Sequence, residues 1–191
     1  MQPASTDLDV VTTDGGFLLV LSIAIPVAGV LIAFVVGGRH VERIAFATIL
    51  LVLAIVAAVV LTLHHNNGPI VYVLGAWTPP LGVALRADGL STIMMTATAV
   101  VICSVALYAR TDFRSDAATS RAATTFWLLL TAISGALNTV FLAGDLFTLY
   151  VALELVTFAA VPLVCLDGRA DTVPCRQCGT HGQHGRDDQD F

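Results

Sequence analysis

Five long apolar stretches dominate the sequence and limit the folds that are open to it. They cover approximately residues 16–36, 44–63, 90–108, 122–142 and 146–165. A helix needs about 20 apolar residues to cross a hydrocarbon core of roughly 30 Å. Each stretch is long enough, so the sequence predicts an all-α, polytopic transmembrane helix bundle of about five spans.

The overall composition agrees with a membrane location. Of the 191 residues, 57% are hydrophobic and only 12% are charged, whereas soluble domains are about 45–50% apolar and about 25% charged. These few charges exclude an ordinary cytosolic enzyme and a disordered protein. A formal net charge of -5 leaves no basic footprint, so we expect the lipid bilayer as a partner and no nucleic acid.

The distribution of arginine predicts the orientation of the spans. The connections after the first and third spans hold five of them, namely Arg39, Arg43, Arg110, Arg114 and Arg121. Residues 1–15 hold none, and the connection between the second and third spans holds only Arg86. Because cytoplasmic loops carry the excess of basic residues, we expect an extracytoplasmic N-terminus over residues 1–15 and a fifth span that ends in the cytoplasm. The membrane is expected to be a bacterial-type inner (plasma) membrane.

Polar residues between the spans predict local structure. Residues 70–86 contain two short strand-like runs around WTPP, which favours a short extracytoplasmic β-hairpin. Asp88 or Ser91 is expected to cap the third span. Asp145 is expected to cap the fifth, where a carboxylate complements the positive helix end. Trp127 lies near the cytoplasmic end of the fourth span, where we expect it to anchor the helix at the interface.

One acidic residue lies far inside the fifth span. Glu154 follows Asp145 by nine residues, which is about 13–14 Å along a helix axis and close to the bilayer midplane. An acid there costs roughly 2.5–3.5 kcal/mol and is a functional candidate by default. We predict a proton-transfer site made of Glu154 with three hydrogen-bonding companions, Tyr150 and Thr157 on the same helical face and Asn138 in the fourth span. The alternative is a lone Glu that a neighbouring helix satisfies merely to hold the bundle together.

Two segments resemble a known family. Residues 144–164, GDLFTLYVALELVTFAAVPLV, look like the fifth-helix motif of the antiporter-like proton-channel subunits, and residues 72–95 are similar to the hairpin and third-helix start of that family. These are the large membrane subunits of complex I, of membrane-bound hydrogenases and of Mrp-type cation/proton antiporters. The resemblance covers about residues 20–168.

The resemblance implies a role for Glu154 and an origin for the chain. In this family the glutamate of the motif belongs to the proton-transfer machinery, opposite a lysine on a later helix, whereas this sequence contains no Lys. The chain is therefore expected to be the N-terminal part of a proton-translocating subunit of a quinone-linked oxidoreductase or of an Mrp-type antiporter. Its implied partners are other membrane subunits, protons and, for the antiporter type, monovalent cations.

The composition changes after Cys165. Residues 166–191 have no apolar period, which predicts a polar, disordered tail or an out-of-frame sequence that begins after about residue 172. A weak metal candidate in this tail consists of Cys175, Cys178, His181 and His184, whose residue types suit zinc but whose spacing is too short for a familiar finger. We expect no cofactor and no redox catalytic site, since the chain has neither a dinucleotide-binding loop nor an iron–sulfur cysteine set. Two other functions stay open: a non-conducting membrane scaffold or assembly protein, and a membrane-anchored metal-binding tail.

Overall fold

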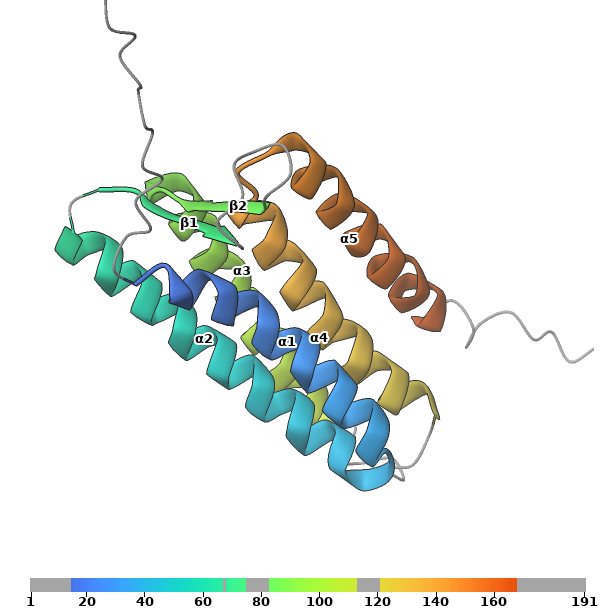
Figure 1. Cartoon of the computed structure of the whole chain (residues 1–191). Coiled ribbons are helices and arrows are strands. Elements are labelled where there is room, and N and C mark those ends of the chain that lie inside the picture. Colours follow the sequence, from blue (N-terminus) through green and yellow to red (C-terminus); the bar gives the residue numbers. More distant parts are fainter. Residues whose placement is uncertain (1–14, 67, 75–82, 113–120, 168–191) are drawn as a thin grey trace, which may run out of the picture.

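Long helices lie side by side along most of the chain, and a hairpin covers one end of the bundle (Figure 1). The computed structural model describes residues 15–66, 68–74, 83–112 and 121–167. Its long helices are α1 (Phe17–Val36), α2 (Val41–Asn66), α3 (Gly89–Asp112), α4 (Arg121–Leu142) and α5 (Leu146–Asp167). All five are long and apolar enough to cross a membrane. The predicted fold class is confirmed, and the chain is an integral membrane protein.

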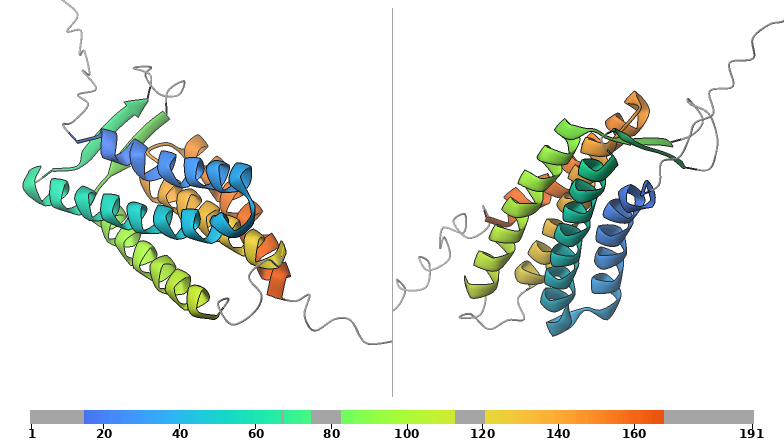
Figure 2. Two further views of the ribbon diagram at one scale, coloured as in Figure 1. Left: turned by 90° about the horizontal axis from the view of Figure 1, so that it is seen from below. Right: turned by 90° about the vertical axis from the view of Figure 1, so that its left-hand side faces the viewer.

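Helix α4 is the centre of the bundle. It packs against α1, α2, α3 and α5, while α1 also packs against α2 and α2 against α3. Helix α5 lies along α4 at the edge of the bundle, as both the front and the turned views show (Figures 1 and 2). One side of α5 therefore contacts the bundle and the other faces outward.

The turn between α1 and α2 depends on two glycines. Gly37 and Gly38 have φ values of 58° and 61°, a left-handed conformation that glycine adopts without steric cost. The Gly37 N–H donates to the carbonyl oxygen of Ala33 at 3.0 Å and closes α1. A single 3₁₀ turn, η1 (Gly38–His40), then leads directly into α2, so α1 and α2 run antiparallel.

The expected hairpin is present at the end of the bundle where α1 and α3 begin (Figure 1). Strands β1 (Ile70–Leu74) and β2 (Val83–Ala87) are antiparallel, with Ile70 opposite Ala87. Ile70 and Leu85 are 1% and 2% exposed and belong to the apolar cluster of the adjoining helix ends. The hairpin therefore closes the core at this end.

Strand β2 also holds the start of α5. The Gly144 N–H donates to the carbonyl oxygen of Ala84 at 2.9 Å, and Leu85 forms a bridge with Ala143. A Cβ on Gly144 would lie 2.6 Å from that same oxygen, which explains why glycine occupies this position. The hairpin thus positions the α4–α5 turn.

Trp127 is a core residue, and its expected role as an interface anchor is wrong. Its side chain is 2% exposed and packs in the apolar cluster at the opposite end of the bundle, which includes Val41 and Ile102. Phe126 meets the indole edge-on, with ring centroids 5.8 Å apart. The residue lies at the depth expected for an anchor, but the rotation of α4 turns it inward.

Candidate functional site

Helix α5 packs against α4 through small side chains. Ala152 and Ala159 are 0% and 4% exposed, and Thr148 is also buried. Small residues at this spacing allow two membrane helices to approach closely. The remaining surface of α5 is uncovered, with Phe147 and Phe158 73% and 80% exposed.

Glu154 lies on this outward face of α5. Its side chain is exposed in the described part of the chain. It follows the first residue of the span, Leu146, by eight positions, which is about 12 Å along the axis. The span Leu146–Leu166 has 21 residues and a length of about 31 Å. The carboxylate is therefore near the middle of the span, on a side that α4 does not cover.

Two predicted companions share the face of Glu154. Tyr150 precedes Glu154 by one helical turn, and its hydroxyl is on the side of the Glu154 carboxylate. The Thr157 hydroxyl donates to the carbonyl oxygens of Leu153 and Glu154, at 3.2 and 2.8 Å. Its oxygen lone pairs can still accept from a neighbouring donor. Tyr150, Glu154 and Thr157 form a polar stripe, a name used below for these three residues.

Asn138, the third predicted companion, lies elsewhere. Its side chain is 2% exposed, and its Nδ2 donates to the carbonyl oxygen of Ser22 in α1 at 3.0 Å. Pro26 lies four residues after Ser22 in the same helix, so the usual helical N–H donor to that oxygen is missing. Asn138 supplies the missing hydrogen bond, as neighbouring helices do for proline kinks in membranes.

The contact between α1 and α4 is tight at this point. A Cβ on Gly135 would lie 2.9 Å from the Cβ of Pro26, so the proline ring and the α4 backbone are in direct contact. Asn138 follows Gly135 by one helical turn and shares its face. We therefore assign Asn138 to the packing of α1 on α4 and not to the polar stripe.

Asp145 joins the start of α5 to the hairpin. Its Oδ1 accepts from the Thr148 N–H at 2.7 Å and its Oδ2 from the Thr148 hydroxyl at 2.8 Å, the geometry of an N-cap. The Thr148 N–H is the main cause that holds the pKa of Asp145 below its ordinary value. The Ala84 N–H adds to this effect, and burial opposes it.

Asp88 has the equivalent position before α3. Its Oδ1 accepts from the Ser91 N–H at 2.8 Å. This hydrogen bond, with a smaller contribution from the charge of Arg86, holds the pKa of Asp88 below its ordinary value. Both caps lie outside the membrane-spanning segments, and both leave the carboxylates ionised at neutral pH.

A cluster that sequence reasoning missed lies at the opposite end of the bundle. Arg110 Nε is 3.4 Å from Glu42 Oε1, and its guanidinium lies over the ring of Phe46 at 4.6 Å. The sequence shows Arg110 only as one basic residue of a connection, because its partners depend on how α2 and α3 align. The ion pair is partly exposed and is worth about 0–1 kcal/mol.

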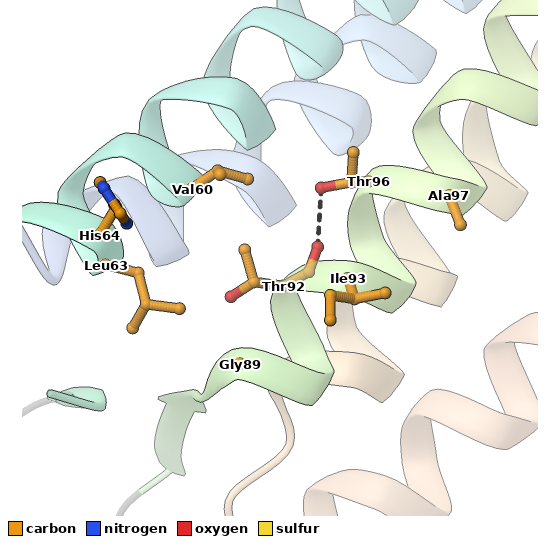
Figure 3. A pocket seen from close by; sticks show the side chains of 8 residues that line it. All are labelled: Val60, Leu63, His64, Gly89, Thr92, Ile93, Thr96 and Ala97. Atoms are coloured by element: carbon orange, nitrogen blue, oxygen red, sulfur yellow. Dashed lines mark hydrogen bonds between the residues drawn. The ribbon is translucent and has the colours of Figure 1, made fainter. Parts of the chain in front are cut away.

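An apolar groove of about 710 Å³ lies between α2 and α3, near the hairpin (Figure 3). It is lined by Val60, Leu63, His64, Gly89, Thr92, Ile93, Thr96 and Ala97. The Thr92 and Thr96 hydroxyls donate to the backbone carbonyl oxygens of Asp88 and Thr92, so they add little polarity. The groove involves α2 and α3, whereas Glu154 belongs to α5, and it contributes nothing to the polar stripe.

The metal candidate cannot be placed. Cys175, Cys178, His181 and His184 all lie outside the described residues. Within residues 15–66, 68–74, 83–112 and 121–167, no group of three or more His, Cys, Asp or Glu side chains is arranged to hold a metal ion.

Known proteins similar in sequence to this chain carry the names of antiporter subunits. The chain is 28% identical to an Na(+)/H(+) antiporter subunit of Bacillus subtilis over 151 residues, which are 78% of this chain and 30% of that protein. It is 29% identical to a putative antiporter subunit mnhD2 of Staphylococcus epidermidis, also over 78% of this chain but 29% of that protein. The chain thus spans less than a third of the length of these relatives. No protein-family model matches it.

The fold also has a counterpart among solved structures. A chain of the membrane-bound sulfane sulfur reductase, an archaeal respiratory membrane complex, superposes with a TM-score of 0.66 at 22% sequence identity. The match covers 76% of this chain and 29% of that one. The similarity shows that the helix arrangement is shared.

Proposed function

We propose that this chain, which is similar to antiporter subunits, forms the N-terminal part of a proton-translocating subunit in which Glu154 takes up and releases the proton. The names of the relatives support a subunit that works within a larger membrane assembly. Two sequence relatives carry antiporter names, so we favour an Mrp-type cation/proton antiporter over a quinone-linked oxidoreductase.

The observation that carries this proposal is the location of Glu154. A carboxylate near the middle of a span costs roughly 2.5–3.5 kcal/mol when it stays in contact with lipid. Protonation removes the charge and most of this cost, so the neutral and ionised forms favour different surroundings. In the neutral form the carboxyl tolerates an apolar contact, and in the ionised form it requires water or a cation. A group with these two states can receive a proton from one side of the membrane and release it toward the other side.

The rest of the polar stripe has a supporting part in this step. The Tyr150 hydroxyl can donate a hydrogen bond to the ionised Glu154, which stabilises the charge before the proton arrives. Thr157 lies one turn further along the same face, and its oxygen can accept from a water molecule. The stripe therefore extends about one turn from Glu154 in each direction.

Replacement of Glu154 by glutamine tests the proposal. Gln keeps the size and hydrogen-bonding ability of Glu but cannot ionise, so Glu154→Gln is expected to abolish proton transfer by the assembled complex in membrane vesicles. Glu42 is the only other Glu in the sequence and lies at the first turn of α2. Glu42→Gln removes the same charge outside the middle of the span and is the matched control. Proton transfer that survives Glu154→Gln at the level of Glu42→Gln would refute the proposal.

We also propose that the hairpin end of the bundle is extracytoplasmic. The arginines that favour this orientation include Arg43 and Arg110, which lie at the opposite end, where α2 begins and α3 ends. Cys165 is exposed near the end of α5, whereas Cys103 is buried within α3. In a chain with Cys175→Ser and Cys178→Ser, a membrane-impermeant maleimide should therefore label Cys165 in inside-out vesicles but not in intact cells. Labelling only in intact cells would reverse the orientation.

A scaffold function has one observation in its favour. The outward face of α5 is mostly apolar, with Phe147 and Phe158 largely exposed, and such a face can pack against another membrane segment. A pure scaffold requires the shape of this face but not an ionisable carboxyl. Normal assembly together with normal proton transfer in Glu154→Gln would support the scaffold, whereas normal assembly without proton transfer supports the proton site.

A further inference from the structure

The chain contains two prolines inside its described helices, and each leaves one backbone carbonyl without its helical donor. Pro26 lies in α1 and Pro162 in α5. Proline has no N–H, so the carbonyl four residues earlier loses its helical hydrogen bond. The carbonyls concerned are those of Ser22 and Phe158.

The protein satisfies the first carbonyl internally. Ser22 is 0% exposed, and Asn138 of α4 donates to its carbonyl oxygen at 3.0 Å. The neighbouring backbone is so close that a Cβ on Gly135 would lie 2.9 Å from Pro26. The donor at this proline is a protein side chain, held in a closely packed contact.

The second carbonyl is in different surroundings. Phe158 is 80% exposed, and Pro162 is exposed as well. Glu154, Phe158 and Pro162 are spaced four residues apart, so they follow one another along a single face of α5. This face also carries the polar stripe and points away from α4.

The Phe158 carbonyl adds a further polar group to this face, beyond the Glu154 carboxylate. Side chains of a helix lean toward its N-terminus, whereas the carbonyl oxygens point toward its C-terminus. The Tyr150 hydroxyl therefore lies on the N-terminal side of the Glu154 carboxylate, and the Phe158 carbonyl oxygen lies on the C-terminal side. The Thr157 hydroxyl, which donates to Leu153 and Glu154, presents its acceptor oxygen between them.

We propose that Pro162 is a positioning residue for proton transfer: it opens the Phe158 carbonyl as a water-binding acceptor that continues the hydrated path from Glu154 toward the C-terminal end of α5. The inference rests on the proposed role of Glu154. Water is the occupant that suits the polar groups of this face, because it can donate to the Phe158 carbonyl and the Glu154 carboxylate and also to the Thr157 oxygen. A carbonyl in a membrane-spanning segment is tolerated without its helical partner where it lines a water-filled cavity.

Hydration of this single carbonyl can be measured in the full chain in lipid bilayers. Labelling with carbonyl-¹³C phenylalanine and ¹⁵N alanine marks two peptide bonds doubly, since Phe46–Ala47 and Phe158–Ala159 are the only Phe–Ala pairs in the sequence. Solid-state NMR then detects magnetisation transferred from water to each labelled carbonyl. Phe46 lies inside α2, four residues before Leu50, whose N–H completes a normal helical bond. The Phe46 carbonyl is therefore the internal reference for a carbonyl that binds no water.

The expected result is strong transfer from water to the Phe158 carbonyl and little to the Phe46 carbonyl. Pro162→Ala restores an N–H donor and should reduce the Phe158 signal to the level of Phe46. Pro26→Ala is the matched control, because it makes the same change where Asn138 already donates, and should leave the Phe158 signal unchanged. A dry Phe158 carbonyl in the wild-type chain would overturn the inference in favour of a protein donor, and an equally wet carbonyl in Pro162→Ala would overturn it as well.

A second readout separates this inference from the proposed function. Proton transfer by the assembled complex is expected to fall at least tenfold in Pro162→Ala but to change little in Pro26→Ala. If Glu154→Gln leaves proton transfer intact while the Phe158 carbonyl is wet, the proposed function fails and the assignment of the water site stands. If Glu154→Gln abolishes transfer while Pro162→Ala is fully active, the inference fails and the proposed function stands.

Discussion

Replacing Asn138 with alanine is expected to destabilise the contact between α1 and α4, and the size of the effect should depend on Pro26. The Asn138 amide donates to the Ser22 carbonyl at 3.0 Å, and both residues are at most 2% exposed. Alanine removes this donor and leaves the carbonyl unsatisfied, which costs about 1–3 kcal/mol. Alanine also leaves a small cavity, whose cost does not depend on the nature of residue 26.

A double-mutant cycle isolates the hydrogen bond from the cavity. In a Pro26→Ala background, residue 26 regains an N–H that can bond to the Ser22 carbonyl, so the oxygen no longer depends on Asn138. The cost of Asn138→Ala should then fall by the energy of the hydrogen bond. Hydrogen bonds between membrane helices average about 0.6 kcal/mol and reach about 1.7 kcal/mol. Because the Ser22 carbonyl has no helical donor, we expect a coupling energy of about 1–1.5 kcal/mol between the two sites.

The assay is reversible unfolding of the chain in mixed detergent micelles, with the four members of the cycle measured side by side. Pro162→Ala makes the same backbone change in α5 and serves as the control background, since distant mutations usually add independently. The cost of Asn138→Ala should be the same in the wild-type and Pro162→Ala backgrounds. Equal costs in the wild-type and Pro26→Ala backgrounds would show that Asn138 does not replace the donor lost at the proline.

Two further predictions concern helix packing and capping. Gly29→Ala should destabilise the protein by about 1–3 kcal/mol, because its Cβ would lie 2.6 Å from side-chain atoms of Thr48. Gly89→Ala, with nothing within 4 Å of the new Cβ, should be neutral in the same unfolding assay. The pKa of Asp145 is lowered in the folded protein. The contribution of this carboxylate to the stability of the fold is therefore complete above its unfolded pKa of about 3.9, and it is lost as the pH falls through the lower folded pKa. The stability advantage of the wild type over Asp145→Asn should therefore shrink below about pH 4, and an advantage that grows with acid would contradict the cap.

The helices could be predicted well from the sequence because membrane spans have a simple signature. The span predicted at residues 44–63 corresponds to α2, Val41–Asn66. The helix extends further at both ends because hydropathy marks only the part inside hydrocarbon. Glu42 and the pair His64 and His65 belong to the helix but suit the polar region outside that layer.

The rotation of each helix could not be predicted in the same way. When all sides of a span are apolar, the hydrophobic pattern does not show which face is buried. The sequence therefore indicates only the depth of Trp127, although its side chain is 2% exposed. The sequence shows Asn138, like Glu154, only as a polar residue inside a span, whereas in the structure the Asn138 side chain donates to Ser22 in α1. The ion pair of Arg110 with Glu42 likewise depends on the alignment of two helices.

The polar groups within the spans are of two kinds: those that bond to a carbonyl nearby in the chain, and those that need a partner elsewhere. Hydroxyls in the described helices commonly donate to a backbone carbonyl three or four residues earlier in the chain, as do those of Ser22, Thr48, Thr62, Thr92, Thr96, Ser104, Thr131, Thr139 and Thr157. Such a residue needs no partner from another segment, so its presence in a span says little about function.

A carboxylate, an amide and a carbonyl freed by proline cannot be satisfied in this way. The Asn138 amide and the Ser22 carbonyl satisfy each other across the α1–α4 contact. The Glu154 carboxylate and the Phe158 carbonyl share the outward face of α5, where both require donors and Tyr150 offers one to the carboxylate. Because these acceptors outnumber the donor that Tyr150 supplies, a stable face requires water or a polar partner at the depth of Glu154, which is the condition that proton transfer also requires.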